Sequence, residues 1–288
     1  MTAAAPLSRL RAAEAHLLSR REGPADPAGA AAAALGLACC APAPADLCAI
    51  GLAIGAAVEA HGASFAPGHE PAYHDRYHQA EATIAAGWLA GEARRAGLLE
   101  PRHAGLCVLA LAGHDLLHDG NAAAPPGTLE RRSAEATAEL TAALPAAERA
   151  EITRLILLTD PAVPPPPDLA GRLVREADLF ASLTPWLGWR LSEALEREWA
   201  AAGIDAMAPI ASHAGRYALL SLLPPMTPSA VSLGLEAARG LQLAALASAG
   251  AAETAEQGAA GLDALPVAEG QARWRAALEA IGLPALAP

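Results

Sequence analysis

The stretch LCVLALAGHDLLHDG, residues 106–120, joins an apolar run to a group of polar side chains that can bind a metal. His114 and Asp115 follow the apolar run directly, and His118 comes about one helical turn later. Burial of such groups costs free energy unless they are paired or hold a metal. The stretch therefore predicts a buried segment that ends at a metal centre.

The composition of the whole chain favours helices. Of its 288 residues, 53% are hydrophobic, and Ala, Leu, Glu and Arg are common whereas Val, Ile, Tyr and Phe are scarce. The positions of Pro, Gly and capping residues divide the chain into an all-α fold of about ten helices. We expect one helix to run from Pro101 to Gly120, and another from Pro228 to Ala249.

The domain organisation is expected to be simple. Residues 1–45 combine an amphipathic pattern with Gly-, Pro- and Ala-rich sequence, so they are expected to form an N-terminal helical segment. Residues 46–288 contain no internal repeat and no convincing linker, so they are expected to form one compact domain.

The charge pattern excludes some classes of partner. The net charge is −11, every fixed cation is arginine, and no basic stripe is visible, so a nucleic-acid partner is not expected. Arg9, Arg11 and Glu14 interrupt the N-terminal apolar residues, which argues against a signal peptide. No window of about 18 uncharged apolar residues occurs, so we expect a cytoplasmic protein without a membrane partner. The sequence leaves open whether it forms a homo-oligomer.

The histidines are distributed unevenly along the chain. Of nine histidines, four fall into two short motifs, YHDRYH with His74 and His78, and HDLLHD with His114 and His118. The members of each pair are four residues apart, which places them on one face if the segment is helical. Imidazole and carboxylate ligands suit Zn, Mn, Fe, Co or Ni, and an oxygen-rich neighbouring site suits Mg. The pattern predicts one or two divalent metal ions.

The order of these motifs resembles that of the HD-domain metal-dependent phosphohydrolase superfamily. The nearest likeness is to its cyclic-nucleotide phosphodiesterase (PDEase) branch. That branch shows Tyr-His-Asn-x-x-His-Ala, then an apolar helix ending in His-Asp-x-x-His-Pro-Gly, then Leu-Glu, then Ala-Asp-Leu. The motifs that match here, over about residues 46–225, are Tyr73-His74-Asp75-x-x-His78-Gln79, His114-Asp115-x-x-His118-Asp119-Gly120, Leu129-Glu130 and Ala177-Asp178-Leu179.

The resemblance implies a fold and a division of roles. The fold would be an HD-domain, PDEase-like multi-helix bundle. The first metal would be bound by His78, His114, Asp115 and Asp178, with Asp115 also bridging to a second metal held mainly by water. His74 would be the general acid that protonates the leaving oxygen, and His118 and Glu130 would orient the reacting water.

The sequence departs from the branch where the purine base would be held. The segment SHAGRY, residues 212–217, stands near the position of a Gln and a Phe that hold the base. His213 replaces the Gln and Arg216 replaces the Phe, which predicts contact with a more anionic group such as a terminal phosphate. These two residues and Tyr73 are the predicted substrate-binding residues.

The motifs together predict a metal-dependent phosphohydrolase that acts on a small-molecule phosphoester, with a nucleotide phosphomonoester or phosphodiester among the candidate substrates. One alternative is an iron-dependent oxygenase on the same fold. Such enzymes need further histidine ligands, and none occurs between His118 and His213. The other alternative is a non-catalytic relative that binds a nucleotide or a protein partner.

Overall fold

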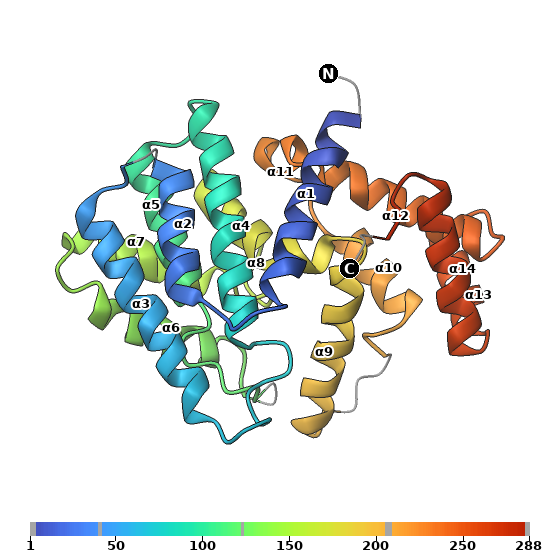
Figure 1. Ribbon diagram of the computed structural model, residues 1–288, viewed down its shortest axis with the longest axis horizontal. Helices are drawn as coiled ribbons and strands as arrows, with labels where there is room; N and C mark the ends of the chain where they lie inside the picture. Colours follow the sequence, from blue (N-terminus) through green and yellow to red (C-terminus); the bar gives the residue numbers. More distant parts are fainter. Residues whose placement is uncertain (1–3, 40–41, 122–123, 205–208, 286–288) are drawn as a thin grey trace. The chain divides into compact units, whose positions relative to one another are not determined.

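The computed structural model describes residues 4–39, 42–121, 124–204 and 209–285, and its regular secondary structure is entirely helical in these ranges. The all-α prediction is confirmed (Figure 1). The helices are α1 (Ala4–Arg20), α2 (Pro27–Cys39), α3 (Ala45–Ser64), α4 (Arg76–Arg95), α5 (Pro101–Gly113), α6 (Thr128–Leu140), α7 (Ala146–Leu157), α8 (Leu169–Leu183), α9 (Leu187–Ala201), α10 (His213–Leu222), α11 (Pro228–Ser232), α12 (Leu235–Ala249), α13 (Ala255–Asp263) and α14 (Val267–Ala280).

The predicted number of about ten helices is too low, because fourteen occur in the described ranges. Part of the difference comes from the segment expected as one helix from Pro228 to Ala249. Gly234 interrupts it with a φ of 91°, a left-handed conformation that favours glycine, and divides it into α11 and α12. A Cβ at Gly234 would also lie 2.3 Å from the carbonyl oxygen of Pro6, so the close approach of the chain requires glycine as well.

The chain forms two compact units. The larger unit consists of Ser19–Ala181 with Thr227–Ser229, and the smaller unit consists of Met1–Leu18, Ser182–Met226 and Ala230–Pro288. None of the boundaries between the two units falls near residue 45, where the sequence pattern suggested one. A boundary near residue 45 stays a prediction.

In the larger unit, α2, α4 and α5 pack against one another, and α3 also packs on α2 and α5 (Figure 1). Two glycines allow the helices to approach closely. A Cβ at Gly87 of α4 would lie 2.6 Å from the Cα of Ala34 in α2, and a Cβ at Gly55 of α3 would lie 2.4 Å from the Cα of Ala28. Close packing buries α4 on most of its circumference, which explains why its polar residues need partners inside the unit.

The helix that carries the central stretch is shorter than predicted. Helix α5 ends at Gly113 rather than at Gly120, and residues 114–117 form turns. Thr137 of α6 donates a hydrogen bond from its hydroxyl to the carbonyl oxygen of Gly113, at 3.3 Å. A side chain at position 113 would collide with Thr137, so glycine allows α6 to pack on the end of α5. His114 and His118 therefore do not share a continuous helix.

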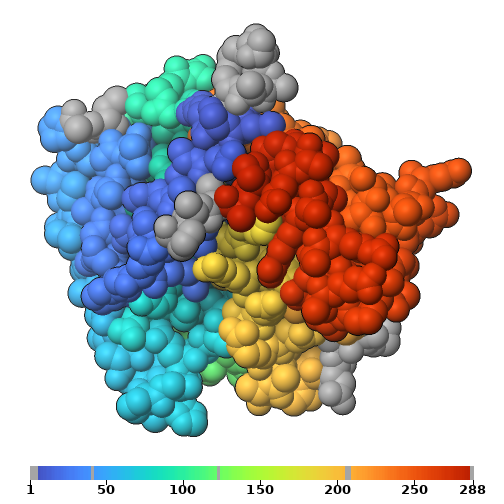
Figure 2. All heavy atoms as spheres, turned by 45° about the vertical axis from the view of Figure 1, so that its right-hand side comes forward, coloured from blue at the N-terminus to red at the C-terminus, as the bar shows by residue number. Residues whose placement is uncertain are grey.

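In the smaller unit, α12, α13 and α14 pack together and α10 contacts α12 and α13. Figure 2 shows the C-terminal helices α13 and α14, in orange-red to red, gathered on one face. A Cβ at Gly258 of α13 would lie 2.1 Å from the carbonyl oxygen of Leu246 in α12, so glycine permits this contact. The buried core of this group is Ala245, Leu246, Ala259, Leu262, Trp274, Leu278 and Leu283.

One helix in the described ranges, α3, is long and apolar enough to cross a membrane by length and composition alone. Its 18-residue window has a mean hydropathy of 1.4. Its residues Leu47, Ile50 and Ile54 are buried within the larger unit. Because the core helix of a soluble protein passes the same test, α3 does not by itself establish a membrane segment.

Candidate metal centre

The start of α4 positions His78. Asp75 caps the helix, and its Oδ1 accepts a hydrogen bond from the backbone N–H of His78 at 2.8 Å. This bond fixes the first turn, so the side chain of His78 is directed into the unit, where the residue is 1% exposed. His74 precedes the helix, and its ring centroid lies 5.7 Å from that of His78. The two histidines are therefore close without sharing one face of a helix.

The end of α5 positions His114. Its Nδ1–H donates a hydrogen bond to the carbonyl oxygen of Leu111 at 2.7 Å. Because a carbonyl oxygen can only accept, this bond places the proton of the neutral imidazole on Nδ1 and leaves the lone pair on Nε2. The Nε2 atom is buried, and it faces the carboxylates of Asp115 and Asp178. A buried, oriented lone pair of this kind fits a metal ligand.

Four predicted ligands converge in the larger unit. The Nε2 atom of His78 lies 3.4 Å from Asp115 Oδ2 and 3.2 Å from Asp178 Oδ1. The Nε2 atom of His114 lies 3.1 and 3.3 Å from the same two oxygens. Ligand atoms at about 2.1 Å from one ion lie about 3.0 Å apart at right angles and about 3.4 Å apart at tetrahedral angles. The observed separations match these values, so the residues fit a divalent metal ion.

Charge balance supports the same conclusion. Burial lowers the pKa of His78, but the neighbouring carboxylates of Asp115 and Asp178 outweigh burial and raise that pKa to about 9. The same two carboxylates raise the pKa of His114 well above its ordinary value against the effect of burial. Burial raises the pKa of each carboxyl, but the two histidines outweigh it and hold both pKa values below their usual range. In the absence of a metal, protons on the histidines balance the buried carboxylates.

Metal binding is therefore expected to release protons and to strengthen as the pH rises toward about 9. At pH 7 the raised pKa values leave His78 and His114 protonated, and an ion must displace those protons. The two carboxylates add no pH dependence near neutrality because their pKa values are depressed. Affinity should rise by about tenfold per pH unit for each proton released. Calorimetric titration with Mn²⁺ between pH 6 and 8.5, in buffers of different ionisation enthalpy, measures both quantities, and an affinity independent of pH would contradict the expectation.

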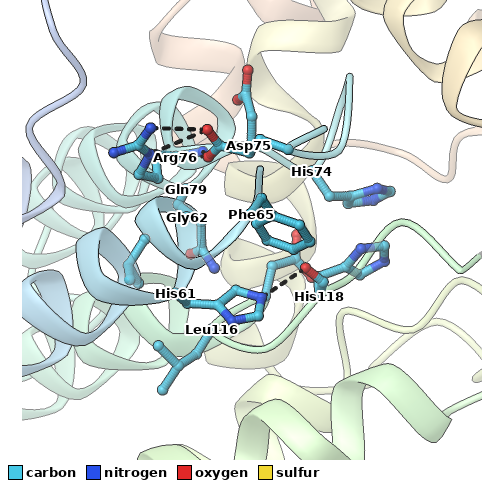
Figure 3. A pocket seen from close by; sticks show the side chains of 12 residues that line it. His61, Gly62, Phe65, His74, Asp75, Arg76, Gln79, Leu116 and His118 are labelled. Atoms are coloured by element: carbon cyan, nitrogen blue, oxygen red, sulfur yellow. Dashed lines mark hydrogen bonds and ion pairs between the residues drawn. The ribbon is translucent and has the colours of Figure 1, made fainter. Parts of the chain in front are cut away.

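The predicted catalytic residues lie around the same cluster. The rings of His74 and His118 stack with centroids 3.7 Å apart and an interplanar angle of 22°, and Figure 3 shows them facing each other. The Nδ1 atom of His118 accepts a hydrogen bond from the backbone N–H of Gly120 at 3.1 Å, which fixes the ring. Burial and then the charges of Asp160 and Asp115 raise the pKa of Glu130, while His74 lowers it. Glu130 is thus within electrostatic reach of the centre.

The three predicted substrate-binding residues have different surroundings. Tyr73 is buried, and its ring centroid lies 4.7 Å from the rings of both His74 and His78. His213 and Arg216 belong to the smaller unit, where each has protein partners. The Nδ1–H of His213 donates to Asp263 Oδ1 at 2.7 Å. These partners account for the burial of the two residues without a substrate, and their role in substrate binding stays a prediction.

The guanidinium of Arg216 is buried and saturated with partners. It donates to the carbonyl oxygens of Ser182 and Thr184, the latter at 2.7 Å, and to the side-chain oxygen of Gln242 at 3.1 Å from Nε. Gly188 leaves space for it, because a Cβ there would lie 2.7 Å from Nη1. Arg216 of α10 thus contacts α12, the last turn of α8 and the residue that follows α8, all within the smaller unit.

Three residues near the centre were not predicted from the sequence. Asp160 is 7% exposed, and its charge acts on Glu130. His61 donates from Nε2 to the carbonyl oxygen of His118 at 3.1 Å, as the dashed line in Figure 3 marks. Gln79 is 3% exposed and lines the same pocket as His61. In the sequence, Gln79 directly follows His78, and Asp160 lies between the end of α7 and Pro161. Neither position by itself predicts a functional residue.

Comparison of the chain with protein-family models, with curated proteins and with solved structures finds no match. We therefore infer the candidate metal centre from the ligand geometry and from the order of the motifs. Within the described residues, His78, His114 and Asp178 can each offer a ligand atom within 4.8 Å of the others, and Asp115 contacts both histidines.

Proposed function

We propose that the protein is a metal-dependent phosphohydrolase that acts on a small-molecule phosphoester. The observation that carries the proposal is the convergence of His78, His114, Asp115 and Asp178, with nitrogen–oxygen separations of 3.1–3.4 Å. A divalent ion bound there supplies Lewis acidity and lowers the pKa of a coordinated water. In a chain with a net charge of −11, such an ion also provides the positive charge that a phosphoryl group requires.

The order of the motifs supports assignment to an HD-type helical bundle. The residues that resemble the superfamily come from four separate segments, and the four that would bind the first metal are those that converge. Helices α4 and α8 and the turn that follows α5 contribute them, so residues distant in sequence meet at one place. This agreement between motif order and geometry is what favours the phosphohydrolase over a general metal-binding protein.

The residues around the centre suit the remaining steps of ester hydrolysis. The phosphorus–oxygen bond breaks as water adds to phosphorus, and the leaving oxygen needs a proton. His74 lies beside the centre, with its ring 5.7 Å from that of His78, and is assigned as the proton donor. His118 stacks on His74 and keeps its orientation. Glu130 is partly buried, and it is assigned to orient the water.

Elemental analysis of the purified protein, combined with a panel of phosphoester substrates, tests the proposal. We expect about one or two divalent ions per chain and turnover of at least one phosphomonoester or phosphodiester. Metal-free preparations that cannot be reconstituted, or a metal-loaded protein that hydrolyses no ester, would contradict it. Ligand binding without turnover would favour the non-catalytic alternative, and oxygen consumption with iron would favour the oxygenase.

His74→Gln is expected to lower kcat for alkyl phosphoesters by about 10²- to 10⁴-fold while the metal stays bound, because the leaving alkoxide then lacks a proton donor. The loss should be much smaller for p-nitrophenyl phosphate, whose leaving group departs without a proton. Steady-state kinetics with both kinds of ester measures the difference. His103→Gln is the matched control, since His103 is 39% exposed and pairs with Glu151. Equal losses for both esters would contradict the assignment of His74 as the acid.

A further inference from the structure

Gln79 is a buried amide without a partner. The residue is 3% exposed, and neither its Nε2 nor its Oε1 has a hydrogen-bond partner among the residues that the structure describes. Its backbone is fully used, because its N–H donates to the carbonyl oxygen of Asp75 and its own carbonyl oxygen accepts from Thr83 Oγ1. An unpaired buried amide costs free energy, so this side chain needs water or a ligand.

The amide lies in a small pocket of the larger unit that it shares with the proposed catalytic residues. His74, Asp115 and His118 line this pocket together with His61. Figure 3 shows Gln79, His61 and His118 around the same opening. A group bound beside the metal centre would therefore lie within the same pocket as Gln79.

The charges around the pocket favour a neutral group. The guanidinium of Arg76 pairs with Glu70 at 3.0 Å and with Glu59 at 2.5 Å, so its charge is already balanced. The rings of His61 and Phe65 contact each other edge to face, with centroids 5.0 Å apart. Arg76 therefore offers no unbalanced charge to a phosphate beside Gln79, whereas a hydroxyl can donate to Oε1 of Gln79 and accept from Nε2.

We infer that Gln79 binds a hydroxyl group in the alcohol part of the substrate, and that the substrate class is a sugar or polyol phosphoester. The inference rests on the proposed function, because it assigns the pocket to the same substrate. A hydroxyl is small enough for the pocket and satisfies both polar atoms of the amide.

Two pairs of esters that differ in one or two hydroxyl groups test the inference. They are ribose 5-phosphate with 2-deoxyribose 5-phosphate, and glycerol 3-phosphate with propyl phosphate. In the native protein, kcat/KM should favour the hydroxylated member of at least one pair by about tenfold. In Gln79→Leu, which removes the amide at similar size, that ratio should fall to within about twofold of one. A ratio that persists in Gln79→Leu, or native ratios near one in both pairs, would overturn the inference.

Thr83→Val is the matched control. Thr83 lies one turn further along α4, is buried, and donates to the carbonyl oxygen of Gln79. The variant perturbs the same turn while keeping the Gln79 amide, so it should retain the native substrate ratio. If Thr83→Val also loses the kcat/KM preference for the hydroxylated ester, the preference depends on the position of α4. That result would overturn a direct role of the Gln79 amide.

A binding measurement separates failure of this inference from failure of the proposed function. If no ester is hydrolysed, the proposed function fails, and thermal shifts with the same four compounds still test Gln79. The native protein should be stabilised more by the hydroxylated member of a pair, and Gln79→Leu should lose that difference. Equal shifts within both pairs, or an unchanged difference in Gln79→Leu, would overturn the inference.

Discussion

Replacing His114 or Asp178 by alanine is expected to remove the bound metal and to lower phosphoester hydrolysis by at least about 100-fold. Each substitution deletes one of the converging ligand atoms, and losses of 10- to 100-fold already follow from changes to groups that only support metal ligands. Elemental analysis and steady-state kinetics measure the two effects. Asp178→Asn is a useful companion, because it keeps the shape of the side chain and removes the negative charge.

Asp168→Asn is the matched control for Asp178. Both aspartates belong to the α8 region, but Asp168 caps the start of the helix, accepts from the backbone N–H of Gly171 at 2.9 Å and pairs with Arg154. Its side chain is 42% exposed, and the variant should keep both metal and activity. Normal metal content in His114→Ala and in Asp178→Ala would show that the cluster is an ion-paired structural group and not a metal centre.

Arg216→Met is expected to lower the free energy of unfolding by about 3–5 kcal/mol, the usual effect of removing one partner from a buried charged network. The guanidinium is 1% exposed, and its loss leaves the carbonyl oxygens of Ser182 and Thr184 and the side chain of Gln242 without their donors. The carboxyl of Glu14, also 1% exposed, loses a nearby positive charge. Urea denaturation measures the change.

Arg273→Met is the control for Arg216→Met. Arg273 lies in the same unit, is 52% exposed and pairs with Glu269 four residues earlier, so its replacement should change stability by less than about 0.5 kcal/mol. Arg216→Lys should recover little of the stability lost in Arg216→Met, because an ammonium group cannot reproduce the planar set of donors of a guanidinium. A stable Arg216→Met variant with a raised KM would contradict the structural role and would return Arg216 to substrate binding.

The partners of Arg216 show what a sequence motif leaves out. The segment of residues 212–217 suggested contact with an anionic group, because a motif identifies residue types and spacing but not what packs against them. In the structure, Arg216 meets oxygens that lie 26 to 34 residues away in sequence. His213 meets Asp263, 50 residues away. Such pairings depend on how the helices pack.

The end of α5 is a second example. The apolar run from Leu106 to Ala112 predicted burial, and those residues are buried. The helix was nevertheless expected to continue to Gly120, because nothing local stops it before that glycine. Thr137, 24 residues further along, packs on Gly113 and accounts for the close contact at that end. The sequence pattern of α5 could not predict this contact, because a residue of a different helix makes it.

The sequence by itself determined the helical class and the identity of the four residues that converge, His78, His114, Asp115 and Asp178. Propensity and burial are local properties, and ligand residues placed beside an apolar run can be recognised without knowing their neighbours. The tertiary structure alone decided that His213 and Arg216 have partners in the smaller unit and that Gln79 is buried without one. The physical reason is that hydrogen-bond satisfaction depends on groups brought together from distant parts of the chain.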